Sequence, residues 1–138
     1  MTDLEDRIGY TFRNRSLLRQ ALTHLSYANE QKTDSNSALA LLGDSLLNAL
    51  ITWKLYQEKP NAKPGDLTET RKGWVSQGRL SDVARGLELE RYLLVGKGEV
   101  RVSPRMLAET FESLVGALFV DGGFEALAPF LDHTFTEE

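Results

Sequence analysis

The chain has 138 residues, of which 41% are hydrophobic and 26% charged, a balance that suits one globular domain over residues 1–138 and argues against extensive disorder. The absence of cysteine excludes disulfides and thiolate metal sites, and the net charge of −4 argues against binding nucleic acid through overall charge. The acidic start MTDLEDRIGY lacks the apolar core of a signal peptide, and no uninterrupted apolar run reaches the roughly 18 residues of a membrane span. We therefore expect a cytoplasmic protein without a membrane partner.

Apolar residues recur at helical spacing along most of the chain and predict an all-α fold with about seven or eight helices. Leu4 and Ile8 indicate a short first helix. A second helix is expected from about Leu17, ending near Ser26. The polar stretch over Asn29–Asn36 is typical of a loop.

The middle of the chain predicts one long helix over about Ser37–Glu58. It is apolar on nearly all sides up to Trp53, so we expect it to be central and buried. The loop KPNAKPGD breaks it, because proline and glycine disfavour a continuing helix. Asp66 or Thr68 is expected to cap the next helix, which runs to about Val75.

Four further segments complete the predicted elements. A helix with its cap at Ser76 or Ser81 ends near Gly86, and the stretch RYLLVGKGEVRVSP is ambiguous between short structure and a basic loop. Pro104 suits the first turn of a helix capped by Ser103, and this helix stops at the Asp-Gly-Gly of residues 121–123. A last amphipathic helix is expected over residues 124–135.

Carboxylates inside apolar helices are the first candidates for a site. Asp44 stands in the largely apolar run NSALALLGDSLLNALI, and Glu109 and Glu112 share one helix face because they are three residues apart. If the three acids converged they would repel each other, and a hard oxygen-seeking cation such as Mg²⁺ would relieve that repulsion. The alternatives are a solvated face for the two glutamates, and for Asp44 a capping role or an ion pair with Arg71 or Arg105.

Five segments, in matching order, resemble those of the ribonuclease III endonuclease domain. The stretch NSALALLGDSLL is similar to that family's signature N-E-R-L-E-F-L-G-D-[AS]-[VL]-L, and MLAETFESLVGALFVDGGF is similar to I-L-A-D-x-F-E-A-L-I-G-A-[IL]-[YF]-L-D-x-G. The other three are LLRQALTHLSYANE, GDLTETRKGWVS and LVGKGE. Together they cover nearly the whole chain, so the resemblance implies the all-helical fold of that domain.

The resemblance also implies an activity. Members of that family work as two-fold homodimers, hold double-stranded RNA along a valley across the dimer, and cut each strand at a magnesium site built from four acids. By position, these acids fall on Ala40, Asp44, Glu109 and Glu112. The resemblance therefore assigns Asp44, Glu109 and Glu112 as catalytic and metal-binding residues for Mg²⁺, with Mn²⁺ as a substitute. Position 40 has lost its carboxylate, and Glu109 replaces the usual aspartate.

Other departures from the family pattern lie close to these acids. Ser37 replaces the first glutamate of the signature, and Pro64 stands where relatives often have glutamate. Leu41 replaces a phenylalanine that inserts into the partner subunit in relatives, so the resemblance assigns it a dimer contact. No double-stranded RNA-binding domain is present within these residues, so we expect substrate binding to rest on this domain.

Basic residues beside the predicted site are candidates for RNA contacts. Lys97, Arg101 and Arg105 flank the loop before the acidic helix, where solvated charge is the ordinary alternative. His24 lies in a matched segment, but a hydrogen-bonded structural role is expected for it rather than catalysis.

Three functions remain open from the sequence. The first is a metal-dependent double-stranded RNA endoribonuclease acting in RNA processing, weakened by the missing ligand at Ala40 and partly rescued if the longer Glu109 reaches the vacated position. The second is a non-catalytic RNA-binding or ribosome-associated module, since losing an acid relieves repulsion in a site without metal. The third is a structural dimer module without an RNA role.

Overall fold

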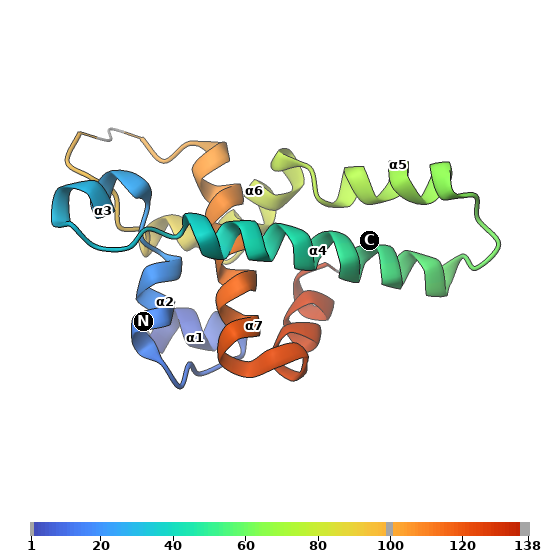
Figure 1. Ribbon diagram of the computed structural model, residues 1–138, viewed down its shortest axis with the longest axis horizontal. Coiled ribbons are helices and arrows are strands. Elements are labelled where there is room, and N and C mark those ends of the chain that lie inside the picture. The colour runs from blue at the N-terminus through green and yellow to red at the C-terminus, as the bar shows by residue number, and fades with distance from the viewer. Residues whose placement is uncertain (1, 99–100, 136–138) are drawn as a thin grey trace.

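The computed structural model of the protein describes residues 2–98 and 101–135, and within them the chain forms seven α-helices (Figure 1). The helices are α1 (Thr2–Ile8), α2 (Arg15–Ala21), α3 (Leu25–Gln31), α4 (Ser37–Glu58), α5 (Pro64–Trp74), α6 (Gln77–Gly86) and α7 (Pro104–Thr134), with a 3₁₀ turn, η1, at Leu89–Arg91. The predicted all-α class and number of helices are confirmed. The long helices α4 and α7 cross near the middle of the molecule (Figure 1).

The N-terminal third differs from the predicted pattern. The second helix ends at Ala21 instead of near Ser26, and a separate α3 occupies part of the expected loop. The cause is a parallel bridge between Thr23 and Leu94, in which the N–H of His24 donates to the carbonyl of Leu94 (2.9 Å). A contact between residues so distant in the sequence leaves no trace in local periodicity. His24 then caps α3 by accepting a hydrogen bond from the backbone N–H of Ser26, which is a structural role.

Helix α4 has the predicted bounds but not the predicted burial. Its buried residues lie on one face, which packs on α7; they are Leu39, Ala40, Gly43, Leu47, Ile51 and Leu55. Leu41 is 71% exposed and Trp53 is 55% exposed, so the expectation of burial on nearly all sides was wrong. Within a single chain α4 packs on α7 and, over its C-terminal half, on α5, so apolar residues on its remaining side stay in solvent.

Helix α5 and the C-terminal half of α4 run antiparallel as a hairpin that extends from the rest of the domain (Figure 1). Helix α5 begins at Pro64 rather than at a cap on Asp66 or Thr68, because proline needs no N–H partner in the first turn. None of its residues is buried. Helix α6 begins as predicted after Ser76, whose hydroxyl accepts from the N–H of Arg79 (3.2 Å).

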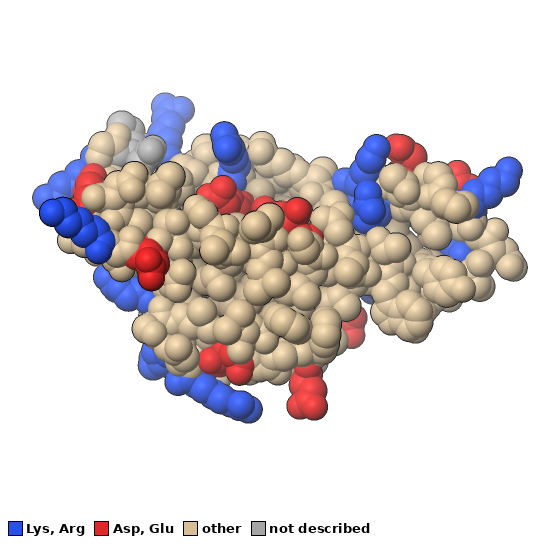
Figure 2. All heavy atoms as spheres, in the orientation of Figure 1, with Lys and Arg blue, Asp and Glu red and all other residues tan. Residues whose placement is uncertain are grey.

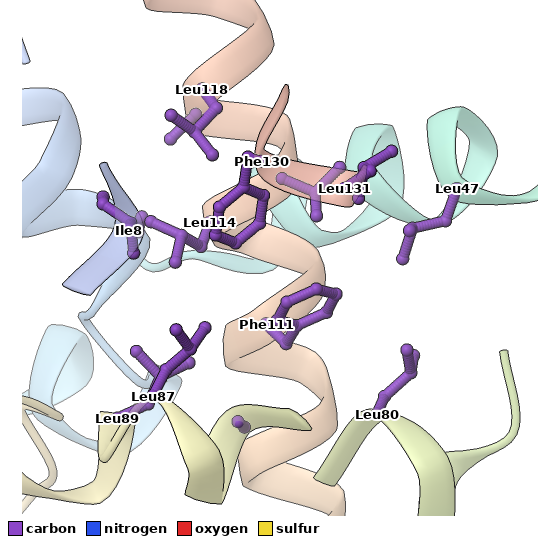
Figure 3. Packing of buried hydrophobic residues seen from close by; sticks show 14 of the residues in the cluster. Ile8, Leu47, Leu80, Leu87, Leu89, Phe111, Leu114, Leu118, Phe130 and Leu131 are labelled. Carbon is purple, nitrogen blue, oxygen red and sulfur yellow. The ribbon is translucent and has the colours of Figure 1, made fainter. Parts of the chain in front are cut away.

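The core is built around α7 (Figure 3). Ser103 caps this helix and Pro104 occupies its first turn, as predicted. The predicted stop appears as a break at Gly123, whose φ of 66° lies in the left-handed region that glycine tolerates best. The break turns the second half back, so that Phe130 packs on Phe111 with ring centroids 5.7 Å apart.

Two helices are long and apolar enough to cross a membrane when judged by length and composition alone. Windows of 18 residues in α4 and α7 reach mean hydropathies of 1.3 and 1.5. The individual apolar runs are shorter, but the average over each helix is high. Because these two helices pack against each other at the centre of the fold, the signal is weak evidence for a membrane span and is typical of core helices.

Candidate active site

Two glycines let α4 and α7 cross in backbone contact. A Cβ atom added to Gly43 would lie 1.7 Å from the carbonyl oxygen of Glu112, and one added to Gly116 would lie 2.2 Å from that of Leu39. No larger side chain fits at either position unless the helices move apart. Asp44 directly follows Gly43, and Glu112 lies one turn before Gly116, so the crossing that builds the core also brings two predicted acids together.

The carboxyl group of Glu112 is half-buried and has an unusual pKa. Burial, a hydrogen bond with Asp44, and repulsion from Asp44 and then Glu109 raise this pKa to about 8. At neutral pH without metal, Glu112 therefore keeps its proton. Asp44 and Glu109 both act on the charge of Glu112, and Glu109 and Glu112 line one pocket; Figure 2 shows acidic side chains gathered near the crossing.

Asp44 is exposed and is held by a neighbour that the sequence analysis did not single out. The side-chain amide of Asn48 donates to the Asp44 carboxylate (3.2 Å) and to the Asp44 carbonyl oxygen (2.8 Å). Asn48 is four residues further along α4, and this spacing was the available signal. The alternative partners Arg71 and Arg105 form no ion pair with Asp44 among the described residues.

Glu109 borders an open pocket of about 260 Å³ between α7 and the start of α6. Its polar lining residues are Gln77, Arg105, Glu109 and Glu112. Gln77 is a second residue missed from the sequence, because nothing in the local pattern links the start of α6 to the acids. Ala40 lies one turn before Asp44 on α4 and is 7% exposed, so it contributes only a methyl group at the crossing.

The acids present fit a divalent cation in part. Asp44 and Glu112 supply carboxylate oxygens within hydrogen-bonding reach of each other, and Mg²⁺ needs only one or two protein carboxylates beside water and substrate oxygens. In the positions that the described side chains occupy, however, no group of three acidic or histidine residues is arranged to hold an ion. A site with Glu109 as third ligand therefore requires that side chain to rotate.

The remaining predicted residues are dispersed. Arg105 lines the pocket beside Glu109, whereas Lys97 and Arg101 lie exposed on the segment before α7 and do not line it. The backbone N–H of Lys97 donates to the carboxylate of Glu30 (2.8 Å), which anchors the chain there and leaves the ammonium group in solvent. Leu41 is on the exposed side of α4.

Comparison with known proteins identifies the class of domain. The sequence profile described as Ribonuclease-III-like matches residues 14–138. Ribonuclease 3 of Oleidesulfovibrio alaskensis is 40% identical, with 96% of this chain and 61% of that protein covered. Ribonuclease 3 of Geobacillus kaustophilus is 39% identical, with 96% and 56% covered. The chain thus spans less than two thirds of the length of these relatives.

Solved structures agree with the sequence relatives. The nuclease domain of ribonuclease III from Campylobacter jejuni matches with a TM-score of 0.88 at 26% identity, covering 100% of this chain and 97% of that one. A second structure of that domain is described as showing structural flexibility in the region involved in dimer formation. Dicer from Pichia stipitis matches with a TM-score of 0.65 at 25% identity, covering 88% and 53%.

The helical fold, built around the crossing of its two longest helices, is that of the nuclease domain of ribonuclease III. The chain belongs to the ribonuclease-III-like family.

Proposed function

We propose that this protein is a divalent-metal-dependent endoribonuclease that hydrolyses phosphodiester bonds of double-stranded RNA, in cytoplasmic RNA processing and as a homodimer. The observation that carries the proposal is the glycine-lined crossing of α4 and α7, which places Asp44 next to Gly43 and close enough to Glu112 to raise the pKa of that half-buried carboxyl group. Two carboxyl groups forced together at a partly buried site destabilise the metal-free protein, and a bound cation offsets that cost.

Asp44 and Glu112 would hold Mg²⁺, or Mn²⁺ in its place, with Glu109 joining after a side-chain rotation. When bound, the ion supplies a Lewis acid that activates water and stabilises negative charge on the phosphate. Glu112 must give up its proton before it can act as a ligand, because its pKa lies near 8. Asn48 keeps the Asp44 carboxylate oriented throughout.

The loss of a carboxylate at Ala40 weakens this site without removing it. Water can take the vacated coordination position, at a cost in metal affinity. Glu109 has one methylene more than aspartate and partly compensates if it turns toward the α4 acids. Catalysis is sensitive to such changes, since a misplacement of about 1 Å can cost on the order of 10²-fold in rate.

A cleavage assay on a long RNA duplex tests the proposal. We expect product with Mg²⁺ or Mn²⁺, and none with Glu112→Gln, which cannot become a carboxylate ligand. Glu125→Gln is the matched control, because Glu125 is an exposed carboxylate elsewhere on α7, and it is expected to cleave normally. The absence of product at high metal and high enzyme concentration would refute a nuclease activity.

The second candidate is a non-catalytic RNA-binding or ribosome-associated module. It is favoured by the methyl group at Ala40 and by the absence of a ready three-carboxylate group among the described side chains. This function predicts duplex binding without product and with no effect of Glu112→Gln. A large gain of cleavage in Ala40→Glu would instead show that the rest of the catalytic site is intact. A structural dimer module would bind no duplex even at low salt.

A further inference from the structure

The pocket beside the acids is lined by polar residues of α7 on one side and of α6 on the other. Glu109 and Glu112 on α7 belong to the proposed metal site. The other polar residues are Gln77, at the start of α6, and Arg105, in the first turn of α7. The volume of about 260 Å³ is several times the roughly 30 Å³ that a water molecule occupies, so the pocket admits a larger group.

The guanidinium of Arg105 is available to a ligand. Arg105 lies four residues before Glu109, a spacing at which an ion pair often forms within a helix. Nevertheless, no ion pair or hydrogen bond of the Arg105 side chain is found among the described residues, while five other ion pairs are present there. Arg105 is therefore a cation beside the acidic residues of the pocket. None of the carboxylates in those five ion pairs neutralises its charge.

Gln77 offers a neutral donor on the opposite side of the same pocket. It is exposed, and its side-chain amide has no hydrogen-bond partner among the described residues. Ser76 caps α6 through the N–H of Arg79, so the side chain of Gln77 is not needed for capping. An arginine fork and an amide facing one space are donors suited to the oxygens of a single phosphate.

We propose that Arg105 and Gln77 together bind one backbone phosphate of the RNA strand in this pocket, beside the carboxylates, and so fix the position of the strand relative to the metal site. The inference rests on the proposed RNA substrate and adds a defined phosphate subsite formed by two helices. The arginine supplies charge and two donors, and the amide of Gln77 supplies a third donor from the α6 side. The carboxyl groups of Glu109 and Glu112 disfavour an anion unless its oxygens point toward the hydrogen-bond donors on the other residues.

The test measures binding of a short RNA duplex to proteins that carry Glu112→Gln, so that cleavage does not interfere. Arg105→Ala is expected to weaken binding and to reduce the slope of log affinity against log salt by about 1, as loss of one phosphate contact requires. Gln77→Ala should weaken binding with no change in slope, since an amide carries no charge. The double variant should lose less than the product of the two single losses, because both residues bind one phosphate.

Two further variants exclude a structural explanation. Arg105→Lys should keep the salt slope but lose the coupling to Gln77, since an ammonium lacks the planar fork. Arg85→Ala is the matched control on α6, where Arg85 already pairs with Asp82 (3.2 Å), and it should alter neither the affinity nor the coupling. Thermal midpoints of all variants should match that of the parent protein.

An unchanged slope in Arg105→Ala, or strictly multiplicative losses in the double variant, overturns the subsite. If the unmodified protein nevertheless cleaves duplex RNA, the proposed function survives that failure. If the affinity losses of the two single variants are coupled but the unmodified protein never cleaves duplex RNA, the subsite is supported and the nuclease activity is refuted. No binding of duplex at low salt would overturn both.

Discussion

Glu112 stands out among single residues because its carboxyl group favours the protonated form. Its pKa of about 8 lies well above the ordinary value of 4.5, through burial first and then through Asp44 and Glu109. The folded protein therefore holds this proton more tightly than the unfolded chain does. The corresponding stability is complete below about pH 4.5 and is lost as the pH rises to about 8.

Glu112→Gln should remove this pH dependence in metal-free protein. An amide keeps a donor toward Asp44 but has no proton to lose, so the variant should melt several degrees above the unmodified protein at a pH above 8 and close to it at a pH near 5. Thermal denaturation across the pH range in a chelator measures the difference. Glu125→Gln should show no such dependence. Parallel curves for Glu112→Gln and the unmodified protein would contradict the assignment.

The affinity for Mg²⁺ should depend on the protonation state of Glu112. Because Glu112 must be deprotonated to act as a ligand, apparent Mg²⁺ affinity should rise about tenfold per pH unit up to about pH 8 and then level off. Isothermal titration calorimetry in buffers of different ionisation enthalpy would also count the released proton. An affinity independent of pH over this range would mean that Glu112 does not ligate the ion.

Ala40→Glu should lower the stability of the metal-free protein and increase the stabilisation that Mg²⁺ provides. Position 40 is 7% exposed and lies one helical turn before Asp44, so a fourth acid should lower the melting temperature in a chelator by several degrees. With Mg²⁺ the new ligand should make the metal-induced rise in melting temperature larger than in the unmodified protein. Ala49→Glu, at an exposed position of α4, is the control. Equal metal-induced rises in both would show that position 40 does not face the ion.

At the scale of helices, the crossing of α4 and α7 links stability to the site. Gly43→Ala would place a Cβ 1.7 Å from the carbonyl oxygen of Glu112, so the helices must separate. We expect a loss of at least about 1–3 kcal/mol in the free energy of unfolding, the usual cost of overpacking, together with weaker Mg²⁺ binding. Gly73→Ala is the control, since nothing lies within 4 Å of a Cβ there. Urea denaturation compares the two, and equal midpoints would contradict the close crossing.

The same helices show what the sequence can and cannot reveal. The bounds of α4 and the start of α7 follow from local signals, namely apolar periodicity and the Ser103–Pro104 cap. The separate α3 was missed because it depends on the distant bridge to Leu94. The three acids were found through their apolar surroundings and the family pattern. Gln77 was not, since only the packing of α6 on α7 brings it to the pocket.

At the scale of the molecule, the apolar exposure of α4 is unusual for a domain with net charge −4. Three large apolar side chains of α4 face solvent. Leu41 is exposed by 71%, Trp53 by 55% and Tyr56 by 52%. Trp53 and Tyr56 stack with ring centroids 6.2 Å apart, which gives the hairpin of α4 and α5 an aromatic surface. Exposed clusters of this kind mark association sites more often than free surface. The proposed homodimer would account for them by covering this side of α4.

Leu41→Glu should weaken that proposed dimer. The substitution places a charge where the partner subunit would otherwise bury the most exposed large apolar side chain of the described residues, 71% of which faces solvent in the single chain. Residues central to an interface cost about 2 kcal/mol or more when lost, so the dimer dissociation constant should rise about 30-fold or more. Leu25→Glu is the matched control, because Leu25 is a 49% exposed leucine on a different helix, α3. Sedimentation equilibrium measures both dissociation constants, and the melting temperature of diluted Leu41→Glu should stay near that of the diluted unmodified protein.

If both variants remain dimers, the dimer contact does not involve Leu41. If the unmodified protein is a monomer at all accessible concentrations, each chain must act alone, and a valley between two copies cannot be where the duplex binds.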